Sequence, residues 1–228
     1  MPAPAGFCRR YVAYSLDAGL LGLLALPWLW PQLGTGFGQL TDEFGQLQAR
    51  LFALVEPSLD SASQPLDRLQ AWLADPLLRA SSAAMIATLT GLFATVAVTL
   101  FVLAAVYFIA SESSPWQASP GKRLCRLRVT DRHGARASVG RISARFFAGM
   151  VSWLLLNLGH ALAAWTPDKR ALHDYLAGTR VELAPGAPAL LPRWARAWLW
   201  LQLAAVVGAL LLAALSYLHG LGEIAGNG

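Results

Sequence analysis

Three long apolar segments without lysine or arginine constrain this chain more than any other feature. They cover residues 11–30, 83–110 and 197–218. A helix of about 20 apolar residues is long enough to cross the hydrocarbon core of a bilayer. Only 14% of the 228 residues are charged, whereas an ordinary soluble domain has about 25%. The sequence therefore predicts an all-α integral membrane protein.

A fourth segment, residues 146–165, is less apolar and is compatible with two topologies. The loops on either side of it, 111–145 and 166–196, are rich in lysine and arginine, whereas the tail from residue 219 has neither. Cytoplasmic loops carry an excess of these residues. Both loops lie inside if residues 146–165 form a re-entrant or interfacial segment, so we predict three transmembrane helices plus this segment, with a cytoplasmic N-terminus. Four plain transmembrane helices are the alternative.

The longest interruption of the apolar pattern, residues 31–82, has three basic residues against six acidic ones, which favours the extracytoplasmic side. Apolar residues recur there at helical spacing. The first stripe is Phe37, Leu40, Phe44, Leu47, Leu51 and Leu54, and the second is Leu66, Leu69, Trp72, Leu73 and Leu77. We predict an extracytoplasmic amphipathic helical hairpin. Its stripes either pack on each other and on the membrane helices or bind another protein.

The basic loop at 111–145 contains a different pattern. RLCRLRVT alternates apolar and basic residues and is followed by DRHG, a turn sequence that ends in Gly134. This alternation predicts a short cytoplasmic β-hairpin. The neighbouring SPGK at 119–122 lacks the glycine spacing of a phosphate-binding loop, so we assign it no nucleotide role.

Two polar features stand out inside the apolar segments. Asp17 lies in the first one, seven residues after Arg10 and on the same helical face. A charged aspartate near the centre of a membrane helix costs about 2.5–3.5 kcal/mol, so it needs a partner or a proton. We weigh two roles for Asp17, an interhelical hydrogen bond that fixes packing and the handling of protons or cations.

The second feature is LNLGH at 156–160. Its Asn157, Gly159 and His160 are weak helix formers and need a wet or protein-lined site. They predict a helix break. His160 is also a candidate to relay protons to Asp17, although a lone histidine at such a break is usually bonded to a freed carbonyl group.

Three stretches, RRYVAYSLD, SPGKRLCRLRVTDRHG and ALHDYLAGTRV, resemble the RDD family of bacterial membrane proteins, named for one arginine and two aspartates. The resemblance places the arginine and the first aspartate at Arg10 and Asp17. It places the second aspartate at Asp174, directly after His173. Some family members have been proposed as cation/proton antiporters, so the resemblance implies a multi-pass protein of the bacterial inner membrane and favours ion antiport. We expect Arg10 to pair with Asp174.

The resemblance divides the chain into an RDD-like membrane domain at 1–183, with the hairpin at 31–82 inserted, and a linker with an additional transmembrane helix at 184–228. Two functions compete. One is a small ion/proton-coupled transporter with a membrane-embedded carboxylate, acting as a homo-oligomer because few helices rarely enclose a pathway. The other is a non-transporting scaffold or assembly factor that binds an envelope protein through the hairpin at 36–80.

Other classes are less favoured. No Ser-His-Asp set or paired-cysteine site is present in the sequence, so we expect no enzymatic activity. The four histidines lie in different predicted compartments or depths, so we expect no metal and no cofactor. The net charge of +5 comes from loops beside the membrane segments, which predicts contact with the lipid bilayer and no nucleic-acid partner.

Overall fold

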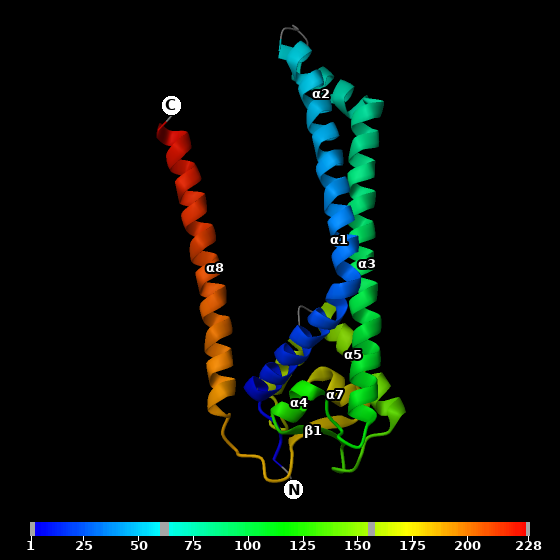
Figure 1. Ribbon diagram of the computed structural model, residues 1–228, viewed down its shortest axis with the longest axis vertical. Coiled ribbons are helices and arrows are strands. Elements are labelled where there is room, and N and C mark those ends of the chain that lie inside the picture. Colours follow the sequence, from blue (N-terminus) through cyan, green and yellow to red (C-terminus); the bar gives the residue numbers. More distant parts are fainter. Residues whose placement is uncertain (1–2, 60–63, 155–157, 227–228) are drawn as a thin grey trace. The chain divides into compact units, whose positions relative to one another are not determined.

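The computed structural model describes residues 3–59, 64–154 and 158–226 (Figure 1). In chain order its elements are α1 (Phe7–Leu59), α2 (Pro65–Ala74), α3 (Pro76–Ser113), α4 (Pro120–Leu124), β1 (Leu127–Asp131), α5 (Val139–Leu154), α6 (Leu158–Trp165), α7 (Leu172–Ala177), β2 (Thr179–Leu183) and α8 (Arg193–Gly226). The chain divides into two compact units. The first unit holds residues 1–19 and 105–228, and the second holds 20–104.

Within the described residues, three helices are long and apolar enough to cross a membrane. They lie in Phe7–Glu56, Pro76–Ser113 and Arg193–His219, which confirms the three apolar segments as membrane-length helices. The described parts of residues 146–165 lie in the 16-residue α5 and the 8-residue α6, and each of these helices is shorter than the roughly 20 residues that a crossing requires. The choice between three and four crossings stays a prediction.

The first of these helices is much longer than the sequence analysis expected. We predicted an apolar helix ending near residue 30, but α1 continues through Pro31 as one helix of 53 residues. At 1.5 Å per residue it is about 80 Å long, whereas the hydrocarbon core of a bilayer is only about 30 Å thick. The first amphipathic stripe of the predicted hairpin is therefore helical, but it is a continuation of α1 and not a separate helix.

In the second unit, α1 and α3 contact each other in antiparallel order. Gly36 faces the side chain of Leu92, and Thr88 Oγ1 donates a hydrogen bond to Glu43 Oε1 at 2.8 Å. The buried and half-buried positions of α1 from residue 33 onward include Leu33, Gly36, Leu40, Glu43, Leu47, Arg50 and Leu54. This regular spacing of three and four residues is the seam of a helix pair.

Half of the predicted first stripe lies in this seam. Its Leu40, Leu47 and Leu54 lie in the seam, whereas Phe37, Phe44 and Leu51 are exposed. The other four seam positions are occupied by Leu33, a glycine and two charged residues, and a search for apolar side chains does not select the last three. Periodicity identified the helix correctly, but the position of α3 determines which face of α1 is covered.

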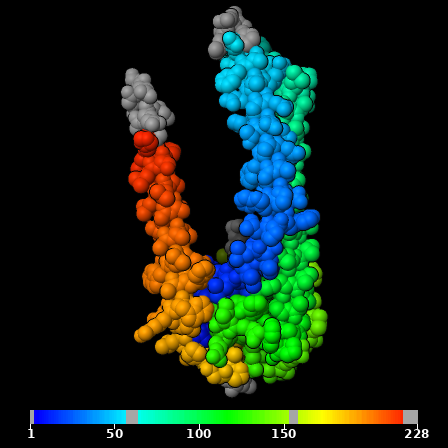
Figure 2. Space-filling view, viewed as in Figure 1, coloured from blue at the N-terminus to red at the C-terminus, as the bar shows by residue number. Residues whose placement is uncertain are grey.

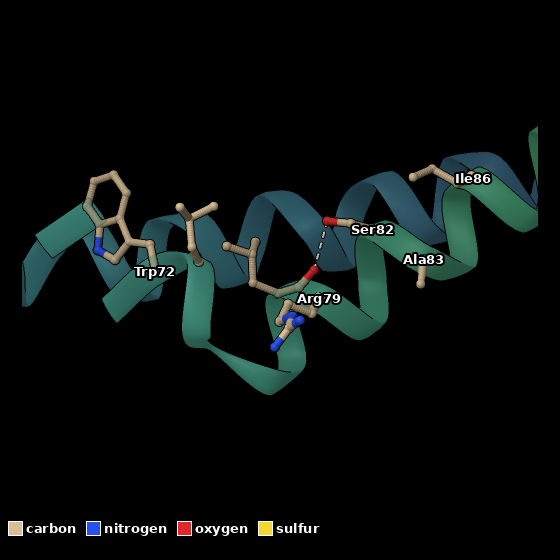
Figure 3. Close-up of a pocket in the computed structure, with 7 residues that line it drawn as sticks. Trp72, Arg79, Ser82, Ala83 and Ile86 are labelled. Carbon is tan, nitrogen blue, oxygen red and sulfur yellow. Dashed lines mark hydrogen bonds between the residues drawn. The ribbon is translucent and has the colours of Figure 1, made fainter. Parts of the chain in front are cut away.

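The second stripe is split between two elements. Trp72 lies on α2 and, together with side chains from the first turns of α3, lines a groove of about 300 Å³ (Figure 3). Four of the five apolar residues predicted for this stripe are exposed, namely Leu66, Leu69, Leu73 and Leu77. Asp75 separates the two helices. It accepts hydrogen bonds from the Leu78 amide at 2.7 Å and from Arg50 Nε at 3.0 Å, which ties the start of α3 to α1.

In the first unit, β1 and β2 form a two-stranded antiparallel sheet with Val129 opposite Val181. The predicted β-hairpin was wrong about the partner of this strand. After the DRHG turn the chain returns to β1 only at an isolated bridge between Thr130 and Arg136. The main ladder instead joins residues about 50 positions apart in the sequence, because β2 follows directly on α7 and returns beside β1.

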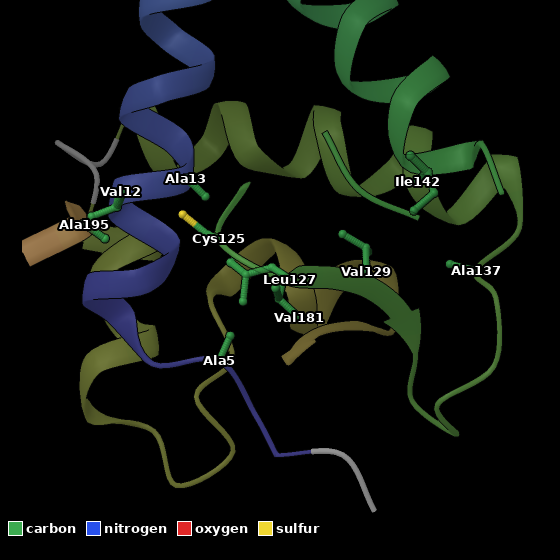
Figure 4. Packing of buried hydrophobic residues seen from close by; sticks show 10 residues of the cluster. All are labelled: Ala5, Val12, Ala13, Cys125, Leu127, Val129, Ala137, Ile142, Val181 and Ala195. Carbon is green, nitrogen blue, oxygen red and sulfur yellow. The ribbon is translucent and has the colours of Figure 1, made fainter. Parts of the chain in front are cut away.

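The hydrophobic core of the first unit surrounds this sheet. Its buried members are Ala5, Val12, Ala13, Cys125, Leu127, Val129, Ala137, Ile142, Val181 and Ala195 (Figure 4). Seven of these residues come from α1, both strands, α5 and α8, and Ala5, Cys125 and Ala137 come from segments outside the helices and strands. The core around the sheet thus links the amino-terminal helix to the last one. Helices α5, α6 and α7 pack against one another beside it.

Candidate functional site

Asp174 lies in a buried network of charges at the start of α7. Its carboxylate is 0% exposed. Arg10 Nη1 on α1 contacts Oδ2 at 2.6 Å, and the Arg145 guanidinium on α5 contacts Oδ1. Oδ2 also accepts a hydrogen bond from the Ala171 amide at 3.0 Å, so Asp174 caps the helix in which it lies. The structure thus brings Arg10 and Asp174 together and adds a second arginine.

Arg145 was missed by the sequence analysis, which counted it among the basic residues of a cytoplasmic loop. In the structure it continues the network, because its Nε lies 3.3 Å from Glu112 Oε2. Glu112 in turn contacts Lys122 Nζ at 2.5 Å. One signal was available in the sequence. Arg145 lies three residues after Ile142 and seven before Ser152, on the buried face of an amphipathic helix.

The network holds three cations, Arg10, Arg145 and Lys122, and two carboxylates, Asp174 and Glu112. Burial lowers the pKa of Arg145, and the Glu112 carboxylate opposes that shift. Buried charges are tolerated only when they are paired and hydrogen-bonded. Removing one member would leave its partner buried and uncompensated, so this network fits a structural role that joins α1, α3, α5 and α7.

Two histidines adjoin the network. His173 Nε2 lies 3.8 Å from Asp174 Oδ1, and the His160 ring is 4.7 Å from the His173 ring between centroids. Burial and the nearby Arg145 lower both pKa values, that of His160 to about 4 and that of His173 well below its usual range. Both imidazoles are therefore neutral at pH 7. Their Nδ1 atoms are buried and lack a hydrogen-bond partner among the described residues.

Among the described residues, the His160 ring contacts the ring of His173 and the ring of Tyr14, whose centroid is 6.1 Å away. No hydrogen bond or ring contact in this part of the chain joins His160 directly to Asp17, so the proton relay stays a prediction. Gly159 is buried in α6 beside the Ser152 side chain. Asn157, the third residue of the predicted break, lies outside the described residues.

Asp17 is also fully buried, but its surroundings are different. Oδ1 accepts hydrogen bonds from Tyr107 Oη at 2.6 Å and from the Gly121 amide at 2.7 Å. Oδ2 accepts one from Ser119 Oγ at 2.5 Å. In the described part of the chain, none of the ion pairs includes Asp17. Its carboxylate is thus held by two hydroxyl groups and one backbone amide, all of them neutral.

The SPGK segment supplies two of these donors. Ser119 is the N-cap residue of α4, and Pro120 follows in the first turn, where its missing N–H is not needed. Gly121 comes so close to α1 that an added Cβ would lie against Ala13 O and 2.8 Å from Asp17 Oδ1. From the sequence, SPGK was assigned no nucleotide role. Its serine, proline and glycine shape a tight turn that donates hydrogen bonds to the Asp17 carboxylate.

Among the described residues, no group of three or more histidine, cysteine, aspartate or glutamate side chains is arranged to hold a metal ion. Cys8 is exposed and Cys125 is buried, and both are free thiols. Burial raises the pKa of Cys125 to about 11, which keeps it protonated and unreactive at neutral pH.

Comparison with known proteins connects these two sites to one family. The sequence profile described as "RDD family" matches residues 4–178, which include Arg10, Asp17 and Asp174. The chain is 32% identical over 82 residues to "Uncharacterized protein YxaI" of Bacillus subtilis (strain 168). That match covers 36% of this chain and 54% of the relative, so the chain spans about half the length of the curated relative. No solved structure gives a significant match.

Proposed function

The chain belongs to the RDD family of membrane proteins, and we propose that it is a small transporter that couples the movement of protons and cations through Asp17. The observation that carries this proposal is that Asp174 is paired with arginines, whereas Asp17 forms no ion pair with a described residue. Asp17 is buried on a membrane-length helix and has only neutral hydrogen-bond partners. Carboxylates at such positions mark proton and ion pathways in many membrane proteins.

The ligand chemistry around Asp17 fits hard cations. Its two carboxylate oxygens lie within 2.6 Å of the hydroxyl oxygens of Tyr107 and Ser119. Oxygen atoms from carboxylates, hydroxyl groups and carbonyls are the ligands that hard cations prefer. A proton or a cation bound there would add a positive charge to a carboxylate that forms no ion pair with a described arginine or lysine, so the proton and the cation can compete for one site.

Asp174 is less suited to this role. Both of its oxygens contact arginine guanidinium groups, so a cation would have to displace a buried arginine to bind. We therefore assign Asp174, together with Arg10, to holding the fold. We also propose a homo-oligomer, because three membrane-length helices are few for enclosing a pathway, and a non-enzymatic role in the bacterial inner membrane with the N-terminus in the cytoplasm.

The test is proton-coupled cation flux in liposomes that contain the purified protein. Asp17→Asn should abolish the flux, because the amide cannot exchange a proton for a cation. Asp42→Asn removes an exposed carboxylate of the second unit and serves as the matched control, which should transport like the wild type. Thermal stability is measured in parallel. Equal flux in the wild type and in Asp17→Asn, or no flux in any of the proteins, would refute the proposal.

A second function, a scaffold or assembly factor that binds an envelope protein, is favoured by the exposed apolar residues of α2. Leu66, Leu69 and Leu73 are 63%, 48% and 64% exposed. If this face binds a partner, Leu69→Gln with Leu73→Gln should abolish crosslinking between α2 and that partner and leave liposome flux unchanged. If neither the wild type nor the variant crosslinks through α2 in intact membranes, the scaffold hypothesis is wrong.

A further inference from the structure

A groove of about 480 Å³ lies between α1 and α8 in the first unit. It is lined by Leu16 of α1 and by Trp194, Ala197, Trp198 and Leu201 of α8. All five side chains are apolar or aromatic, and both helices are of membrane-spanning length. In a bilayer, a lipid acyl chain is the apolar group available to fill such a groove.

The groove is held open by a specific set of hydrogen bonds between the two helices. Trp198 Nε1 donates to Ser15 Oγ at 3.0 Å, and Gln202 Nε2 donates to the same oxygen at 3.3 Å. Tyr11 Oη donates to Gln202 Oε1 at 2.9 Å. These polar contacts fix the spacing of α1 and α8 beside the groove. A preformed groove of this kind binds a ligand without the free-energy cost of reorganising the protein.

Cationic groups gather at the end of α8 that borders the groove. Arg193 and Arg196 lie in the first turn of α8 on either side of Trp194. Both are exposed, and neither side chain forms an ion pair or hydrogen bond with another described residue. The amino-terminal end of a helix adds a partial positive charge and free N–H groups. Tryptophans at this position are typical of the boundary between hydrocarbon and headgroups.

A further cation lies at the same junction. Arg9 of α1 is 5% exposed, and its Nη2 donates to the carbonyl oxygens of Pro188, at 2.8 Å, and Leu190 in the segment that leads into α8. Its Nη1 is buried and has no partner among the described residues. The junction of α1 and α8 thus offers three arginines and no carboxylate in the first turn of α8.

We propose that this groove binds one anionic phospholipid, with an acyl chain along Leu16, Trp198 and Leu201 and the phosphate group beside Arg193 and Arg196. Clusters of arginine and lysine beside membrane helices attract anionic headgroups, and arginine suits phosphate because of its fork of donors. In α8, seen in orange to red in Figure 2, the cationic first turn is followed by an apolar helix. This is the order of polarity in a phospholipid. Helix α8 lies outside the matched family region.

The test uses the full-length protein in detergent, titrated with dioleoyl phosphatidylglycerol or dioleoyl phosphatidylcholine and followed by native mass spectrometry. We expect one phosphatidylglycerol to be retained. Its affinity should fall by roughly tenfold or more in Arg193→Gln with Arg196→Gln, because two headgroup cations are lost. Arg79→Gln with Arg126→Gln removes two exposed arginines elsewhere and should leave the affinity unchanged.

A second pair of variants tests the acyl chain. Ala197→Phe fills the groove and should prevent retention of the lipid, whereas Ala209→Phe, placed on α8 away from the groove, should not. sn-Glycerol 3-phosphate, which carries the phosphate without acyl chains, should not bind measurably. Equal affinity for the two lipids, wild-type affinity in the arginine variant, retention by Ala197→Phe or equal binding of glycerol phosphate would each overturn the proposal.

Discussion

Asp17 and Asp174 are both fully buried and both lie in the first unit, but they are stabilised in opposite ways. Asp174 contacts two arginines and belongs to a row of five side chains of alternating charge, namely Arg10, Asp174, Arg145, Glu112 and Lys122. Asp17 is held by two hydroxyl groups and an amide. Burial alone therefore does not reveal the role of a membrane carboxylate. The charge of its partners separates a carboxylate that fixes the fold from one that has room for a proton or a cation.

The largest expected effect comes from removing the charge of Asp174. Asp174→Asn would leave Arg10 and Arg145 buried with only part of their compensation. We expect a loss of about 3–5 kcal/mol in the free energy of unfolding, as is typical when one partner of a buried pair is removed. Asp17→Asn should cost less, about 1–3 kcal/mol, because its neighbours are neutral. Unfolding of both variants in detergent measures the difference, and equal losses would show that the two carboxylates contribute alike to stability.

A smaller effect is expected from the turn that receives Asp17. Gly121→Ala adds a Cβ that meets Ala13 O and the Asp17 carboxylate, so the α4 backbone has to shift. We expect a loss of about 1–3 kcal/mol in the free energy of unfolding, as for other overpacked sites. Gly140→Ala is the matched control, since nothing lies within 4 Å of its added Cβ. A tolerated Gly121→Ala would show that the close approach to Asp17 is not needed.

The histidines beside Asp174 predict a pH dependence. The pKa of His160 is lowered from 6.5 to about 4 in the folded protein, so below pH 6.5 the unfolded chain binds a proton that the folded chain does not. Stability should therefore fall as the pH drops from about 6.5 to 4, by about 1.4 kcal/mol per pH unit for this group. His160→Gln should flatten this slope, whereas His133→Gln, on an exposed turn, should not. Identical slopes in all three proteins would contradict the prediction.

The sequence alone determined the parts of this protein that the bilayer dictates. Apolar runs of about 20 residues reveal membrane helices because a helix of that length spans the lipid core and satisfies its own backbone hydrogen bonds. The helical stretch after residue 31 was visible because its apolar residues recur at steps of three and four. Asp17 stood out because charges are rare within apolar segments, and Arg10 because it shares a helical face with Asp17. Asp174 was identified only through the resemblance to the RDD family.

The tertiary structure decided how these parts are paired. β1 pairs with β2 and not with the segment after its own turn. Arg145, which was predicted to lie in a basic loop, contacts Asp174. Glu43 lies in the helix seam, where the apolar periodicity had predicted Phe44. Local sequence fixes which residues share a face of a helix or strand. Which neighbour covers that face depends on contacts between residues far apart in the chain, and only the folded structure supplies them.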